Sequence, residues 1–250
     1  MSSHKDNRKY FIENEYSKYW INARKGKYKL NSYDLALINT LKNISSSKVL
    51  EIGIGTGEGI AESFLDKDLY GIDISSKLVD ECKRLFPDIN VSVADAEDLH
   101  FENKKFDLSY CVHSTWYFPN LNQAISEMIR VTKPNGHVCF DIQNILNERI
   151  KNNLSKHIFE NTKFLGKLYK LLKNLIKYIT KRGQAEWGYS VYEIPSNPIS
   201  IINFLKKQDV KSIKTYALNQ KEDALLDELE FREINSNFEN YPRILFIINI

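Results

Sequence analysis

The chain has 250 residues, 42% of them hydrophobic and 27% charged, which is the composition of a globular protein able to bury a sizeable core. Its formal net charge of +3 is too small for this length to indicate a general affinity for DNA or RNA. Three scattered cysteines without C-x-x-C or Cys/His spacing indicate neither a disulfide framework nor a metal site. We expect a cytoplasmic protein, because the polar start lacks an apolar signal core and no apolar run approaches the roughly 18 residues of a membrane span.

The first distinct segment, residues 8–28, interleaves aromatic side chains with charges ahead of the first clear strand. These aromatic residues suit either the buried face of a helix or a lid that excludes water from a ligand, and the sequence leaves both alternatives open. Asn31 and Ser32 are typical N-cap residues, and they predict a helix that runs to about residue 44. The aromatic residues in question are Tyr10, Phe11, Tyr16, Tyr19, Trp20 and Tyr28.

From residue 48 onward, short apolar runs alternate with amphipathic segments of helical length. Strands separated by helices of this length imply βαβ units and a parallel sheet. The predicted strands are 48–52, 69–74, 90–94, 106–112 and 137–142, and the predicted helices between them are a short one ending near 65, then 76–85 and 122–132. After an interruption the pattern resumes with a helix at 198–207, a strand at 210–218, an acidic stretch at 221–240 and a strand at 243–248, and the two strands suit an antiparallel hairpin.

A glycine-rich turn follows the first predicted strand, in the sequence Glu51-Ile-Gly53-Ile-Gly55-Thr-Gly57-Glu58-Gly. A strand that turns at once into a helix needs glycine where φ is positive or where a ligand contacts the backbone. A dinucleotide fingerprint would require Gly or Ala at position 58, where a carboxylate sits badly beside a pyrophosphate. The turn therefore favours a ligand without phosphates over NAD, with a tight turn that binds nothing as the alternative.

Two carboxylates follow the next two strands of the predicted sheet. Asp73 ends the second strand, twenty residues after Gly53, where a carboxylate can accept hydrogen bonds from both ribose hydroxyls. Asp95 ends the third strand, where it could accept a hydrogen bond from an adenine amino group. The pattern predicts a nucleoside-containing ligand.

Taken together, these motifs resemble the class I S-adenosylmethionine-dependent methyltransferases over roughly residues 45–145. The shared features are E-x-G-x-G-x-G, an acid that ends strand two and A-D-A at the end of strand three. The resemblance implies S-adenosyl-L-methionine as the cofactor, with Gly53, Gly55 and Gly57 against its methionine part and Glu51 ordering the turn.

The resemblance also assigns the remaining cofactor-binding residues. Asp73 would bind the ribose, and Ile74 would flank the adenine. Asp95 and the N–H group of Ala96 would read the adenine edge. Cys111, which ends the segment similar to the family's fourth strand, completes the expected set.

The fold that this resemblance implies is α/β and Rossmann-like. We expect a seven-stranded, mostly parallel sheet with an antiparallel last strand, helices on both faces, an N-terminal helical lid and a helical insertion after strand five. The expected parts are an N-terminal helical cap at 1–44, the cofactor-binding core at 45–144, a basic helical insertion at 145–195 and the C-terminal part of the same sheet at 196–250.

Chemistry is expected at the carboxyl ends of the strands, where open α/β sheets bind their ligands. His113, just after strand four, is the first candidate for a general base, because imidazole can accept a proton near pH 7. The alternative is that His113 only lines the pocket or contacts a loop carbonyl. Asp141 and Tyr117 are the further catalytic candidates. The amine-directed N/D-P-P-Y type of motif is absent after strand four, which argues against methylation of DNA bases.

Residues 163–182 form a strongly basic segment with apolar residues at helical spacing, and this pattern predicts a basic amphipathic helix. Such a helix could pack as a lid over the acceptor site, lie on a membrane surface, or receive an anionic acceptor. We favour the lid over membrane contact.

The residues therefore predict an enzyme that transfers methyl from S-adenosylmethionine to a hydroxyl oxygen of a small polar molecule, such as a sugar-type or phosphorylated metabolite. An anionic acceptor is one of the possibilities, and RNA is not expected because no separate RNA-binding module is visible. The alternatives are an N-methyltransferase for a small-molecule amine, a non-catalytic S-adenosylmethionine-binding subunit and an NAD-linked oxidoreductase, against which Glu58 and Asp95 speak.

Overall fold

The computed structural model describes residues 10, 12–24, 29–150, 194–218, 225–229 and 240–250. The predicted basic helix at 163–182 lies outside these residues. Within them, a mixed sheet has the strand order β3-β2-β1-β4-β5-β8-β6-β7. Its strands are β1 (Lys48–Ile52), β2 (Asp68–Asp73), β3 (Asn90–Val93), β4 (Phe106–Cys111), β5 (Thr132–Gln143), β6 (Ser212–Leu218), β7 (Leu226–Leu229) and β8 (Arg243–Asn249).

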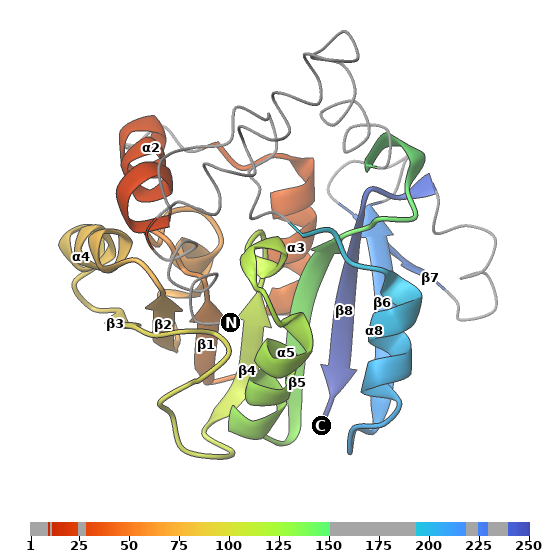
Figure 1. The fold of residues 1–250 in the computed structure, drawn as a ribbon. Helices are drawn as coiled ribbons and strands as arrows, with labels where there is room; N and C mark the ends of the chain where they lie inside the picture. The colour runs from red at the N-terminus through yellow and green to blue at the C-terminus, as the bar shows by residue number, and fades with distance from the viewer. Residues whose placement is uncertain (1–9, 11, 25–28, 151–193, 219–224, 230–239) are drawn as a thin grey trace, which may run out of the picture.

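Strand directions follow the Rossmann-like expectation. β1 to β5 pair in parallel, whereas β8 is antiparallel to both of its neighbours, β5 and β6. The α/β class, the mostly parallel sheet and the antiparallel last strand are thus confirmed, and so is the pairing of the last predicted strand with the strand at 212–218. The parallel strands β1 to β5 run their carboxyl ends to one edge, toward the top of Figure 1, and β8 runs in the opposite direction.

The strand count differs from the expected seven, because β7 adds an eighth strand among the described residues. β7 pairs antiparallel with β6 at the edge of the sheet, and only Leu229 of its residues is buried. Asp227 and Glu228 are exposed, as charged residues on edge strands commonly are. In the sequence this segment is acidic and lacks an apolar alternation, so no strand was predicted there.

Helices cover both faces of the sheet, as predicted (Figure 1). α5 and α8 pack on one face with the even-numbered residues of β5 and β8, and α3, η2 and α4 pack on the other. The described helical elements are η1 (Ile12–Tyr16), α2 (Ser17–Arg24), α3 (Ser32–Lys42), η2 (Ala61–Phe64), α4 (Ser76–Leu85), η3 (Thr115–Tyr117), α5 (Leu121–Val131) and α8 (Pro198–Leu205). None of them is long and apolar enough to cross a membrane.

Local capping explains where α3 begins. The Asn31 side chain accepts from the backbone N–H groups of Tyr33 and Asp34, and the Asp34 carboxylate accepts from the Asn31 N–H in return. Such a capping box satisfies donors that a helix start otherwise leaves unpaired. By contrast, the helix expected up to residue 65 is only the short 3-10 segment η2, because the glycines before it all have positive φ.

The centre of the sheet is held by a ring pair between β5 and β8. Phe140 and Phe246 are fully buried, lie opposite each other in the register, and stack with centroids 5.0 Å apart and planes 9° from parallel. The alternation that turns these rings toward α5 and α8 turns Asp141, Gln143 and Arg243 toward α3. β5 and β8 therefore both supply polar side chains to the other face.

Phe246→Ala should lower the free energy of unfolding by about 3–5 kcal/mol, because it removes a buried ring and its stacking partner's contacts. Urea denaturation followed by circular dichroism measures the loss. Phe204→Ala, on partly buried α8, is the control and should cost clearly less. Equal losses in the two variants would contradict the assignment of the ring pair as the centre of the core.

Candidate functional site

A cavity of about 410 Å³ opens at the carboxyl ends of the strands, a volume within the range of small-molecule sites. It is lined by residues that follow β1, β2, β3 and β4, by the end of β5 and the start of β8, and by residues of η1 and α2. The lining includes the predicted residues Glu51, Gly53, Gly55, Asp73, Ile74, Asp95, Ala96, His113 and Tyr117. Gly57, Cys111 and Asp141, also predicted, are not part of it.

Two glycines of the turn, Gly55 and Gly57, have different surroundings, which explains why only Gly55 lines the cavity. Gly55 has φ +60, and an added Cβ would meet nothing within 4 Å, so its backbone faces open cavity. Gly57 has φ +80, and a Cβ there would meet Cys82 Sγ and a Phe86 ring carbon at 2.9 Å. Gly55 thus allows a ligand to approach the backbone, whereas Gly57 allows close packing of the turn against α4.

Asp73 lies at the end of β2, is buried, and connects the turn to the cavity. One carboxylate oxygen accepts from the Gly55 N–H at 3.0 Å and the other from the Ser75 N–H at 2.9 Å. Burial raises its pKa to about 6, although hydrogen bonds from the backbone of Ser75, Gly55 and Ile74 oppose this increase. Each oxygen retains accepting capacity for a hydroxyl group, because a carboxylate oxygen can accept more than one hydrogen bond.

The other predicted cofactor residues occupy different surroundings. Glu51 is buried beneath the turn and accepts from the Tyr110 hydroxyl at 2.8 Å. Asp95 accepts from the Glu97 N–H at 3.0 Å, which shapes the loop after β3. Cys111 is fully buried in the core on the α5 face, where burial raises the pKa of its thiol well above the usual value. Cys111 therefore supports the cavity floor without reaching the cavity.

His113 lies just after β4 with φ +62, an uncommon conformation for a residue other than glycine. Its Nε2 is 2.8 Å from Asp34 Oδ1, and its Nδ1 accepts a hydrogen bond from Arg243 Nη1. Because a guanidinium can only donate, Nδ1 carries no proton and Nε2 donates to Asp34. Both ring nitrogens are thus engaged, so His113 can act as a base only after its contact with Arg243 breaks.

Asp141 is fully buried behind His113. It accepts from the His113 backbone N–H at 2.8 Å and from the Tyr33 hydroxyl at 3.4 Å, and its Oδ2 lies 3.8 Å from Arg243 Nη1. Since Asp141 does not line the cavity, its contacts position His113 and Arg243.

The cavity lining also holds polar residues that were not predicted from the sequence, among them Gln143 and Arg243. These two face each other across β5 and β8 in the strand register, although a hundred residues separate them in the chain. The available signal was their place at the end of one predicted strand and the start of another. The pairing itself becomes visible only when β8 is placed beside β5.

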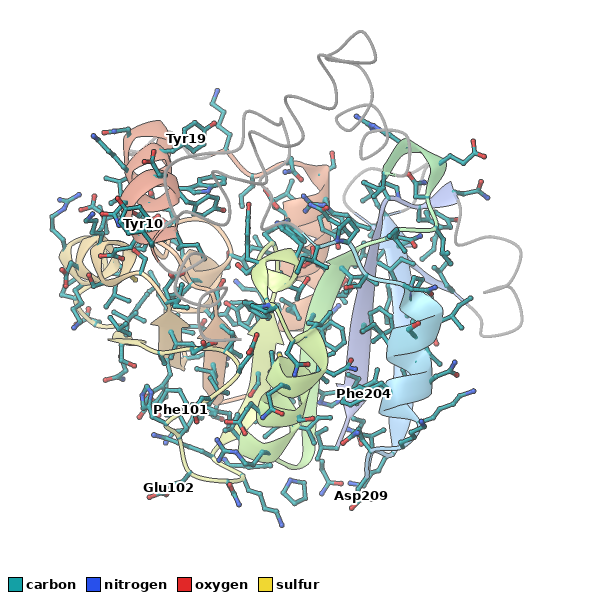
Figure 2. All side chains as sticks on the ribbon, viewed as in Figure 1. Tyr10, Tyr19, Phe101, Glu102, Phe204 and Asp209 are labelled. Atoms are coloured by element: carbon teal, nitrogen blue, oxygen red, sulfur yellow. The ribbon has the colours of Figure 1, made fainter. Side chains whose placement is uncertain are left out.

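Part of the N-terminal aromatic segment faces the cavity, and part of it is exposed to solvent. Tyr16 and Trp20 line the cavity, and Tyr16 contacts Tyr117 edge to face at 5.1 Å between ring centroids. Tyr10 and Tyr19 are 63% and 66% exposed, and Figure 2 shows them around α2, at the opposite end of the molecule from Glu102 and Asp209. Phe11 and Tyr28 lie outside the described residues.

Comparison with known proteins agrees with this geometry. The methyltransferase domain family matches residues 50–140. The structure of an S-adenosylmethionine-dependent methyltransferase from Thermotoga maritima, described as a possible histamine N-methyltransferase, covers 98% of each chain with a TM-score of 0.61 and 13% identity. A second S-adenosylmethionine-dependent methyltransferase, from Clostridium acetobutylicum, gives a TM-score of 0.57 at 14% identity over 95% of this chain and 98% of that one. At these identities the two structures show the shared fold.

Residues 50–140 are thus similar to the methyltransferase domain family, and the chain shares the fold of class I S-adenosylmethionine-dependent methyltransferases. The fatty-acid O-methyltransferase of Mycolicibacterium smegmatis is 29% identical over 119 residues, 44% of this chain and 43% of that protein. An uncharacterized protein of Methanocaldococcus jannaschii is 28% identical over 77% of this chain and 72% of its own length. The chain thus spans about two fifths of the length of the first curated relatives that it matches.

S-adenosylmethionine is the cofactor of this family, and the residues present fit it. The open backbone at Gly55 and the carboxylates of Asp73 and Asp95 face one continuous cavity, and that cofactor has no phosphate for Glu58 to repel.

Gly57→Ala should destabilise the fold more than Gly55→Ala. Both introduce a side chain at positive φ, which costs roughly 1–2 kcal/mol, but only the methyl group at position 57 also collides with Cys82 and Phe86. Thermal and urea denaturation of the two variants provide the comparison. Gly55→Ala should instead weaken ligand binding, since its methyl group enters the cavity. Equal loss of stability in both variants would contradict this division.

Affinity for S-adenosylmethionine should decrease below pH 6, because protonated Asp73 loses a charged acceptor for the ribose. With the pKa at about 6, the decrease in affinity approaches tenfold per pH unit well below pH 6, and the affinity becomes constant near pH 7. The folded protein also holds this proton more tightly than the unfolded chain, so the group's contribution to stability falls as pH rises from about 4 to about 6. Calorimetric titration between pH 5 and 7.5 tests the affinity. Asp73→Asn is the control and should bind weakly at every pH; a wild-type affinity independent of pH would exclude Asp73 from ribose binding.

Proposed function

We propose that this protein transfers a methyl group from S-adenosylmethionine to an oxygen atom of a small-molecule acceptor. The observation that carries the proposal is that one cavity spans two groups of strands, β1–β3 and β4–β5–β8, with different side chains over each. On the β1–β2–β3 side lie the glycine turn and the two carboxylates that suit a nucleoside. On the β4–β5–β8 side lie His113, Gln143 and Arg243, which are not among the proposed cofactor-binding residues.

The proposed cofactor residues keep the roles expected from the sequence, with two changes. Gly53 and Gly55 admit the methionine part, Asp73 binds the ribose, and Asp95 with Ala96 reads the adenine beside Ile74. Gly57 and Cys111 support the site by packing. Glu51 orders the turn from below. When bound, the cofactor supplies a methyl carbon activated by its positively charged sulfur.

The chain's own contribution is to bind, orient and exclude water. Trp116 and Tyr117 of η3, with Tyr16 and Trp20 of the N-terminal segment, line the cavity with aromatic rings that can shield the transfer from solvent. We propose that residues 1–44 form a cap and that residues 145–195 complete the acceptor region. The expected cytoplasmic location stays a prediction.

The relatives' names support a small-molecule acceptor over a nucleic acid. One is called a fatty-acid O-methyltransferase and another a phthiotriol/phenolphthiotriol dimycocerosates methyltransferase. The first of these names specifies oxygen as the accepting atom, and both favour a less polar acceptor than the expected sugar-type metabolite.

Binding and turnover can be tested separately. Calorimetric titration should show binding of S-adenosylmethionine and S-adenosylhomocysteine, and far weaker binding of NAD. Incubation with cofactor labelled in its methyl group and a metabolite extract should then yield a labelled product whose new bond mass spectrometry assigns to oxygen or nitrogen. Preference for NAD would refute the cofactor assignment, and a product methylated on nitrogen would refute the oxygen acceptor.

A further inference from the structure

The β4–β5–β8 side of the cavity holds a guanidinium group in a fixed orientation. Arg243 Nη1 donates to His113 Nδ1 and lies 3.8 Å from Asp141 Oδ2. The Arg243 Cζ atom also lies over two rings, 4.9 Å from the Trp116 centroid and 5.4 Å from the Tyr33 centroid. Contacts of this kind restrict the plane of a guanidinium, and the energy of ordering the side chain is then spent before a ligand arrives.

Only the Nη1 side of this guanidinium is occupied by described residues. Its Nε and Nη2 atoms form no hydrogen bond with the part of the chain that the structure describes, and the side chain is 35% exposed in the wall of the cavity. An Nε–Nη2 edge presents parallel N–H donors that match the two oxygens of a carboxylate. The free edge is thus a ready-made partner for a planar anion.

Gln143 is the neighbour of Arg243 across the strands, and its amide gives a second, independent observation. The residue is 9% exposed and lines the cavity, and its buried Oε1 has no hydrogen-bond partner among the described residues. A buried polar atom without a partner is costly, so it indicates that a ligand supplies one. A half-turn of the amide exchanges Oε1 with Nε2 and places a donor at the same position.

The surrounding groups are poorly suited to remove a proton. Both ring nitrogens of His113 are engaged, Asp34 accepts from His113 and from the Asn31 N–H, and Asp141 accepts from His113 and Tyr33. A hydroxyl acceptor loses a proton during methyl transfer and benefits from a base. A carboxylate acceptor has no proton to lose.

We propose that the methyl acceptor is a monocarboxylate, held by Arg243 and Gln143 and converted to its methyl ester. This inference rests on the proposed function and names its substrate class. One carboxylate oxygen uses a lone pair to form the new O–C bond, the S–C bond breaks, and its electron pair remains on sulfur. The negative charge of the acid and the positive charge of the sulfonium disappear together, and no proton is transferred.

A single negative charge fits this subsite better than two. Asp34 and Asp141 are fully buried beside Arg243 and His113, so two carboxylates already oppose the positive charge of Arg243. A phosphate dianion would add a second negative charge in a poorly hydrated space, where like charges repel strongly. Arg243 and Gln143 are therefore specificity-determining residues for a carboxylate.

The test uses the full chain and cofactor labelled in its methyl group, with a panel of straight-chain and aromatic monocarboxylic acids, each paired with the alcohol and the amide of the same skeleton. Methyl esters release labelled methanol in mild base, whereas methyl ethers and N-methyl products do not. We expect volatile label from at least one acid and none from its alcohol or amide. Base-stable label from an alcohol or amide, or no volatile label from any acid, would overturn the proposal.

Variants identify the subsite. Arg243→Gln should raise KM for the acid about 10- to 150-fold, the range for a lost charge-assisted hydrogen bond. S-adenosylhomocysteine binding should remain near that of the wild type. Arg84→Gln, which breaks an exposed ion pair with Glu81 on α4, is the matched control and should leave both values unchanged. An unchanged KM in folded Arg243→Gln would refute the role of Arg243.

Gln143 keeps the proposal testable if Arg243→Gln fails to fold. Gln143→Glu should weaken binding of the monocarboxylate far more than Gln143→Leu does, because it places a second carboxylate beside that of the ligand. If Gln143→Glu instead improves turnover, the acceptor is a cation and the inference is wrong. If the wild-type protein does not bind S-adenosylhomocysteine, the proposed function itself is refuted. Failure of the proposed function is thus distinguished from failure of the carboxylate inference.

Discussion

Two fully buried carboxylates, Asp34 and Asp141, are the constraint on which the acceptor side of this protein depends. An unpaired charge in such a place is strongly destabilising, and breaking a buried pair by removing one partner typically costs about 3–5 kcal/mol. The partners come from His113, Arg243 and Tyr33, so the requirement ties α3 to the loop after β4 and to β8. The cavity wall on this side is therefore a charge network with little freedom to rearrange.

The cofactor side follows a different rule. There the backbone carries the site, since the four glycines of the turn have positive φ and Asp73 accepts from the Gly55 N–H. A ligand can approach a cavity wall made of backbone closely, whereas a wall made of side chains can discriminate between ligands. The sheet order places the first kind over β1 to β3 and the second over β4, β5 and β8. A shared cofactor and a variable acceptor need this combination.

Local signals were enough to predict much of the fold and the cofactor side. α4 and β1 begin and end at the predicted residues, because a capping residue marks α4 and an apolar run marks β1. A short helix was predicted after the glycine turn, and η2 is a single 3-10 segment there because the four glycines before it have positive φ. β7 and the Arg243–Gln143 pair could not be predicted, because a charged edge strand has no apolar pattern and a cross-strand pair depends on which strands become neighbours. His113 was found, but its tautomer depends on Asp34 and Arg243, which are 79 and 130 residues away.

Those separations have a consequence for how the chain folds. His113 holds a left-handed backbone conformation that an isolated loop disfavours, and contacts with α3, β5 and β8 stabilise it. Contacts so distant in sequence carry a large loop-closure entropy and form after local ones. The turn after β1 and the β1–β2 pair can therefore order early, whereas the loop after β4 reaches its final conformation only when the C-terminal strand docks. A chain interrupted before β8 would lack both the Arg243 contact that fixes His113 and the Phe246 ring that packs on Phe140, so synthesis must reach the last strand before this wall of the cavity can form.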